Sequence, residues 1–225
     1  MTQKKRYFAR SKISEARFRG LVRCFALDLT ATTTAELTGI SLRSVNAIFL
    51  RIRQRMAEEC ERHSPFTGEV GVDESFFGPW RVRGKRGRGA YKKTIVFGML
   101  KRGDCLYTQI VPNCRAATLQ AVIRGHVALD STILSDCLSS YDGLVDLGYA
   151  KHLRIRHSDD RWAEGPNHIS GIESFWSYAK RRLAKFNGLS KRTFQLHLKE
   201  CEYRFNHRHD DLYRAVLKLL RSHPI

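Results

Sequence analysis

Residues 68–77, GEVGVDESFF, mark the point where the sequence changes from helical to strand periodicity, and this change decides the expected fold. Apolar residues alternate with small or polar ones along the stretch, which is typical of a half-buried β-strand. Upstream, FRGLVRCFALDL (18–29) and VNAIFLRIRQRM (45–56) repeat apolar residues at helical spacing. We therefore expect an all-helical region over 1–66 and an α/β region over 67–225.

The sequence after this first strand alternates between strand and helix signals. A hairpin is predicted over 92–112 with its turn at 102–104, and a short amphipathic helix over 115–127. Short strands follow in STILSD (131–136) and HLRIRH (152–157), and then a long helix over 169–186 and a final helix over 190–206. Together these elements predict a mixed sheet flanked by helices. It matches the ribonuclease H-like layout.

Within the helical region, residues 30–49 have the spacing of a helix-turn-helix. Small Ala35 is followed four residues later by Gly39, which favours a left-handed turn, and then by apolar Val45 and Ile48. Ser41 is a good N-cap for the second helix. The alternative is a plain three-helix bundle with an ordinary turn. In a helix-turn-helix, the positions facing a major groove would be Arg43, Ser44, Asn46 and Ala47.

The charge balance indicates a polyanionic partner. Forty Lys and Arg against 22 Asp and Glu give a formal charge of +18. Nucleic acid is the first candidate, a membrane surface the second, and a solvated basic surface without a partner the third. The glycine-rich segment 79–93 favours an arm along a DNA backbone or minor groove over a solvated loop. Its cations are Arg81, Arg83, Lys85, Arg86, Arg88, Lys92 and Lys93.

Cysteine usage and hydropathy point to a reducing compartment. The six cysteines form no CxxC pair, so neither a zinc ribbon nor a disulfide scaffold is expected. No apolar run approaches the length of a membrane span. We expect a cytoplasmic protein with no membrane association, located on the nucleoid if the host is bacterial.

Three carboxylates stand where a metal site on this fold would need them. Asp73 lies on the first strand, Asp136 ends a short apolar strand, and Glu173 opens the late helix. Converging carboxylates from separate elements hold two divalent ions for phosphodiester chemistry, and hard oxygen ligands select Mg²⁺ or Mn²⁺. Glu173 and Lys180 are seven residues apart and share a helix face. Lys180 and Arg181 are thus expected to contact DNA beside the carboxylates.

Other residues are alternatives for the same site. Glu74 follows Asp73 but is expected on the opposite face of the strand. Further acids in the expected loops are rivals for the second or third ligand, and histidines nearby could donate a hydrogen bond or transfer a proton. The acids are Asp142, Asp159 and Asp160, and the histidines are His157 and His168.

Several long motifs, in this order, closely resemble the DDE-type insertion-sequence transposases of the ISXO-like (insertion sequence fifteen-ninety-five) group. They are GEVGVDESFFGPWRVRGKRGRG (68–89), SDCLSSYDGLVDLGY (135–149), NHISGIESFWSYAKRRLAKFNG (167–188) and LHLKECEYRFNHR (196–208). The resemblance implies a ribonuclease H-like core that cleaves terminal inverted repeats and joins the 3′-hydroxyl to target DNA. It also implies an acidic triad of Asp73, Asp136 and Glu173 with two Mg²⁺ ions, and a Lys180 contact near the scissile phosphate.

The sequence departs from the group's pattern at two positions. Gly71 stands where relatives often have Glu, and Ser170 stands where they have Asn after His168. These departures keep a catalytically decayed transposase or a helix-turn-helix regulator open as an alternative. A further alternative is another ribonuclease H-like nuclease or a resolvase. Because transposition joins two DNA ends, a homo-oligomer on double-stranded DNA is expected.

Overall fold

The computed structural model describes residues 6–9, 11–62, 66–78, 93–101, 105–136, 141, 143–145, 147–154, 168–186 and 188–225. The chain forms two compact units. One combines Met1–Cys60 with Lys199–Ile225, and the other is Glu61–Leu198. Helix α6 (Lys191–Asn206) is continuous across the boundary between them.

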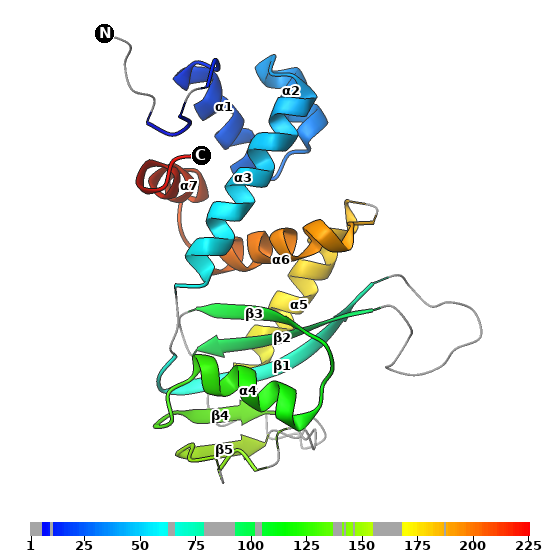
Figure 1. The fold of residues 1–225 in the computed structure, drawn as a ribbon, viewed down its shortest axis with the longest axis vertical. Helices are drawn as coiled ribbons and strands as arrows, with labels where there is room; N and C mark the ends of the chain where they lie inside the picture. Colours follow the sequence, from blue (N-terminus) through cyan, green and yellow to red (C-terminus); the bar gives the residue numbers. More distant parts are fainter. Residues whose placement is uncertain are drawn as a thin grey trace, which may run out of the picture. The chain divides into compact units, whose positions relative to one another are not determined.

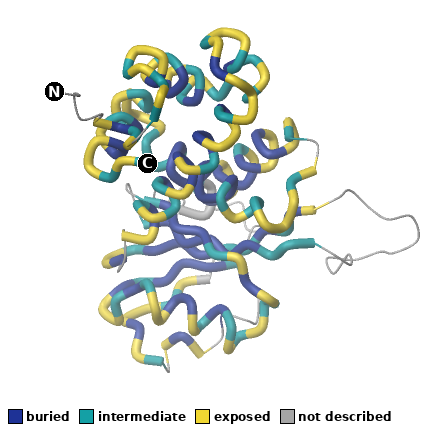
Figure 2. The backbone as a smooth tube through the Cα atoms, turned by 45° about the horizontal axis from the view of Figure 1, so that its top comes forward, coloured by how far each residue is buried: buried dark blue, intermediate teal, exposed yellow. Residues whose placement is uncertain are grey.

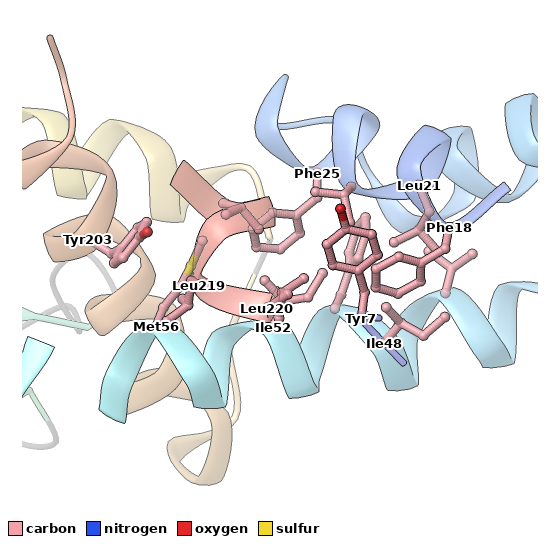
Figure 3. Close-up of a cluster of buried hydrophobic side chains, with 14 of the residues drawn as sticks. Tyr7, Phe18, Leu21, Phe25, Ile48, Ile52, Met56, Tyr203, Leu219 and Leu220 are labelled. Atoms are coloured by element: carbon pink, nitrogen blue, oxygen red, sulfur yellow. The ribbon is translucent and has the colours of Figure 1, made fainter. Parts of the chain in front are cut away.

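The first unit is all helical. It contains α1 (Glu15–Ala26), α2 (Ala31–Thr38), α3 (Leu42–Cys60) and α7 (Leu212–Ser222), together with the second half of α6. Aromatic and aliphatic side chains from both ends of the chain share one core, shown in Figure 3. Phe25 and Phe49 pack edge to face with ring centroids 4.9 Å apart. Residues far apart in sequence therefore stabilise one small domain.

Helices α2 and α3 form the predicted helix-turn-helix. Gly39 ends α2 in the left-handed region, with φ 63°, and its N–H donates to the Ala35 carbonyl at 2.9 Å. The Ser41 hydroxyl accepts from the Ser44 N–H at 3.3 Å, so Ser41 caps α3 as expected. Val45 and Ile48 are buried in the core. The arrangement is thus confirmed on the residues that predicted it.

The second unit is built on a five-stranded mixed sheet. Its strands are β1 (Glu69–Phe77), β2 (Thr94–Lys101), β3 (Leu106–Val111), β4 (Thr132–Ser135) and β5 (Lys151–Arg154), in the spatial order β3-β2-β1-β4-β5. The first three strands are antiparallel, whereas β4 pairs parallel to β1 and β5 parallel to β4. Figure 2 shows that the central strands are buried over most of their length.

Helices cover both faces of this sheet, as Figure 1 shows. Helix α4 (Ala116–His126) joins Val70, Val72 and Phe97 in the core on one face. Helix α5 (His168–Ala184) packs on the other, where a Cβ added to Gly171 would lie 2.6 Å from Leu100 Cδ2. Glycine at this position therefore lets α5 approach the sheet closely.

The sheet order and its two helical layers confirm the expected ribonuclease H-like fold. No α-helix lies among the described residues between β4 and β5, in line with the two successive strands expected over 131–136 and 152–157. Helix α7 was not predicted, although Leu212, Val216 and Leu219 have helical spacing. The hairpin turn at 102–104 lies outside the described residues.

The compact units also divide the chain differently from the expected ranges 1–66 and 67–225. The last 27 residues, Lys199–Ile225, belong with the N-terminal helices and not with the sheet. The physical reason is that α7 places Val216, Leu219 and Leu220 in the helical core. The assignment of DNA binding to one region and catalysis to the other stays a prediction.

Candidate active site

Asp73 and Asp136 lie where the pairing between β1 and β4 ends. Partners on these strands differ by 63 in residue number, as in Glu69 with Thr132 and Gly71 with Leu134. Continuing that offset by two residues brings Asp136 level with Asp73. Neighbouring strands lie about 4.8 Å apart, so residues at this register are close neighbours.

The Asp73 carboxylate is held by two hydrogen bonds. Trp176 on α5 donates its indole Nε1–H to Asp73 Oδ2 at 2.9 Å, and the Glu74 N–H donates to Oδ1 at 2.8 Å. The pKa of Asp73 is raised to about 6, with burial as the largest cause; the carboxylates of Glu74 and Asp136 contribute to the rise, and the two hydrogen bonds oppose it. The surroundings of Asp73 therefore disfavour its ionised form.

The backbone before Asp136 is fixed by Ser135, the last residue of β4. Ser135 is fully buried, and its hydroxyl donates to the Asp136 carbonyl at 2.9 Å. The same oxygen lies 2.8 Å from His152 Nε2 on β5. These contacts tie the carboxyl end of β4 to its neighbour strand.

Glu173 and Lys180 lie on α5, and both are exposed. Glu173 is three residues before Trp176, so the two side chains are neighbours on the helix surface. The Lys180 Nζ lies 5.8 Å from the centroid of the Phe77 ring, at the end of β1. The exposed Arg181 extends one guanidinium nitrogen to within 3.5 Å of Ser177 Oγ.

Within the part of the chain that the structure describes, no group of three or more His, Cys, Asp or Glu is close enough to hold a metal ion. The β1–β4 register places Asp73 and Asp136 level with each other. The full set of three ligands, with Glu173, stays a prediction.

Glu74 lies on the other side of the sheet, as strand alternation predicted. Its Oε2 accepts a 2.7 Å hydrogen bond from the hydroxyl of buried Tyr141. Burial raises the pKa of Tyr141 strongly, and the Glu74 carboxylate adds to the rise. Glu74 is thus bound away from the face that carries Asp73 and Trp176.

The remaining predicted residues are placed only in part. Arg43 and Asn46 are exposed near the start of α3, where a groove-reading helix would present them. His168 and Ser170 lie in the first turn of α5, for which the structure describes the backbone. Residues outside the described part are Arg83, Lys85, Arg86 and Arg88 of the basic segment, His157, and the rival acids Asp142, Asp159 and Asp160.

Sequence reasoning missed three residues that shape this site, namely Trp176, Ser135 and His152. Trp176 could have been suspected from its i+3 position after Glu173. Its contact with Asp73 also depends on Gly98 of β2, which no local pattern reveals. Ser135 and His152 meet only because β4 and β5 pair in parallel.

The donors present suit a divalent cation. Two carboxylates from neighbouring strands supply hard oxygen atoms. The pKa of Asp73 is raised mainly by burial and also by the carboxylates of Glu74 and Asp136, and a bound cation would favour its ionised form. Among the described residues, no helix is both long and apolar enough to cross a bilayer.

Comparison with known proteins gives a family. Residues 65–206 match the family described as "ISXO2-like transposase domain". An "Uncharacterized transposase-like protein" of Haemophilus influenzae is 46% identical over 115 residues, which are 51% of this chain and 92% of that protein.

Two solved structures resemble the chain at a low level. A pre-cleavage Mos1 transpososome has a TM-score of 0.32 and 12% identity, covering 96% of this chain and 81% of the other. The Mos1 mariner paired-end complex with Mn has a TM-score of 0.31 and 17% identity, covering 98% of this chain and 81% of the other. Scores this low add nothing to the match over residues 65–206. On that match, the chain belongs to the family of ISXO2-like transposase domains.

Proposed function

We propose that this protein is a metal-dependent transposase that cleaves DNA at the ends of an insertion sequence and joins the 3′-hydroxyl to target DNA. The observation that carries the proposal is the β1–β4 register, which continues to bring Asp136 level with Asp73. Membership of the transposase family supports the same chemistry.

Asp73, Asp136 and Glu173 are the residues that would hold two Mg²⁺ ions, for which Mn²⁺ could substitute. Such ions, when bound, activate an attacking water or 3′-hydroxyl and stabilise the leaving oxygen. The chain contributes the carboxylates, their positions, and a cation for the phosphate. We assign that last role to exposed Lys180, seven residues after Glu173 on α5.

DNA binding is assigned to two further regions. The exposed Arg43 and Asn46 on α3 would read a major groove in the terminal inverted repeats. The basic segment over 79–93 would lie along the backbone. Because two ends must meet, the working form is expected to be a homo-oligomer on double-stranded DNA.

The test is cleavage of labelled DNA that carries the flanking ends of the gene, with Mg²⁺, with Mn²⁺ and with EDTA. We expect nicking at the end of the inverted repeat that needs the metal. Asp73→Ala and Asp136→Ala should each abolish nicking and leave end binding in EDTA intact, since the carboxylates are remote from α3 in sequence. Full cleavage by Asp136→Ala would remove that residue from the site.

A second candidate is a DNA-binding regulator or a decayed transposase. The observation that favours it is the well-formed helix-turn-helix, whose Gly39 turn and Ser41 cap do not depend on the carboxylates. Tight end-specific binding by the wild-type protein without nicking in either metal would support this candidate. Suspicion would then fall on Gly71 and Ser170.

A further inference from the structure

Trp176 makes an unusually specific contact for a buried aromatic residue. Its side chain is only 5% exposed, yet its one polar atom, Nε1, is directed at Asp73 Oδ2 at 2.9 Å. Buried indole N–H groups normally find a partner, but a backbone carbonyl would serve equally well. Here the partner is a carboxylate of the candidate active site.

The sheet is shaped to receive this ring. Gly98 on β2 is the register partner of Asp73. A Cβ at Gly98 would lie 2.7 Å from Trp176 Cζ2 and 2.9 Å from Cη2, so any larger residue would displace the indole. Phe77 packs against the ring from the end of β1, with centroids 6.0 Å apart. The indole is thus held by contacts that do not involve Asp73.

The two hydrogen bonds on Asp73 together fix its carboxylate. The Glu74 N–H holds Oδ1 and Trp176 holds Oδ2, so both oxygens have one fixed donor. A carboxylate has about four acceptor positions, so each oxygen keeps capacity for a cation. The bond from Glu74 is local to the strand, whereas the bond from Trp176 sets the orientation relative to α5, which carries Glu173.

We propose that Trp176 is a positioning residue of the active site, which orients the Asp73 carboxylate toward a divalent cation by its indole N–H, with Gly98 providing the space for the ring. This inference rests on the proposed function. Outer partners of metal ligands commonly change metal affinity about 10–100-fold when they are removed. Trp176→Phe keeps an aromatic ring and removes the N–H donor, although its ring is smaller than the indole.

The experiment uses the full chain and measures Mn²⁺ binding by electron paramagnetic resonance without DNA. Trp176→Phe should bind Mn²⁺ about 10–100-fold more weakly than wild type. It should need correspondingly more Mn²⁺ for half-maximal nicking, with unchanged DNA affinity in EDTA. Gly98→Ala, which keeps the donor but displaces the ring, should weaken Mn²⁺ binding in the same direction.

Tyr141→Phe is the matched control. It removes one hydrogen bond to Glu74, the next residue on β1, on the opposite face of the sheet. Its Mn²⁺ affinity should equal that of wild type. A merely structural role for Trp176 would give Trp176→Phe the same Mn²⁺ affinity as wild type, even with a lower melting temperature.

The outcomes separate this inference from the proposed function. If wild type binds Mn²⁺ and nicks DNA ends, while Trp176→Phe binds Mn²⁺ equally well, the positioning role is wrong and the function stands. If Trp176→Phe does not fold, an unchanged Mn²⁺ affinity in Gly98→Ala overturns the inference. If wild type neither binds Mn²⁺ nor nicks DNA ends, the positioning role and the proposed function are both wrong.

Discussion

At the scale of the residue, Asp73 is a carboxylate placed where the metal-free fold disfavours its charge. It lies on the central strand, beside Glu74 in sequence and level with Asp136, and burial raises its pKa to about 6. The unfolded chain has the ordinary value, so the folded state binds a proton more tightly. Stability that depends on this proton is present below about pH 4 and is lost as pH rises toward 6.

The stability of metal-free Asp73→Asn relative to wild type should therefore increase as pH rises from about 4 to 6 and stay constant above. Asparagine has one acceptor oxygen and so keeps only one of the two hydrogen bonds. That loss does not depend on pH, so the change with pH reports the charge. Melting temperatures of both proteins in EDTA across this range check the prediction. Mg²⁺ should then stabilise wild type and not the variant; equal shifts in both would argue against a metal at Asp73.

Lys180 is predicted to contact a DNA phosphate. Lys180→Ala should lower the dependence of log affinity on log salt concentration by about 0.9, the effect of one lost contact. Lys218→Ala, an exposed cation on α7, is the control for a general loss of charge. Equal salt slopes for Lys180→Ala and wild type, measured by fluorescence anisotropy, would refute the contact.

At the scale of the element, α7 shows how a helix can be essential to a domain far away in sequence. Its N-cap Asp211 accepts from the Arg214 N–H at 3.1 Å, and its apolar side includes fully buried Val216 and Leu220. The opposite side carries the exposed Arg214, Lys218 and Arg221. The helix therefore forms by packing its apolar side in the helical core.

Leu220→Ala should destabilise the helical unit by about 2–5 kcal/mol, because it removes buried methyl groups and leaves a cavity. Lys218→Ala on the exposed side of the same helix should change stability by less than about 0.5 kcal/mol. Urea denaturation followed by circular dichroism measures both values. Similar effects of the two substitutions would mean that α7 does not pack as described.

At the scale of the whole molecule, the two ends of the chain are joined by buried charges within the helical unit. Glu200 on α6 accepts from Arg53 Nε of α3 at 2.7 Å and from Arg204 Nε at 2.9 Å. Arg204 also donates to the Ala26 carbonyl at the end of α1, at 3.0 Å. Removing one partner of such a network leaves an uncompensated buried charge, which costs about 3–5 kcal/mol.

A fragment of residues 1–66 should therefore fail to unfold cooperatively, although it contains the complete helix-turn-helix. It would expose Arg53 and the apolar residues that Tyr203, Val216 and Leu219 cover. Adding a peptide of residues 191–225 should restore a cooperative transition, as measured by thermal denaturation. A sharp transition in the fragment alone would support the division at residue 66.

Features that are local in the chain could be predicted from the amino-acid sequence. The strand alternation of 68–77, the helical spacing around Val45 and Ile48, and the Gly39 turn each depend on neighbouring residues, so the elements and the fold class could be predicted. The acid candidates Asp73 and Asp136 followed from their places on strands. The order of the longer motifs also carried the family resemblance.

Which distant residues meet depends instead on strand pairing and helix packing. The β1–β4 register brought Asp73 and Asp136 level, and Gly98 made the space that lets Trp176 reach Asp73. Likewise, Glu200 joined the end of the chain to α3. These contacts depend on strand pairing and packing between segments separated by many residues, and local periodicity contains no information about such pairings.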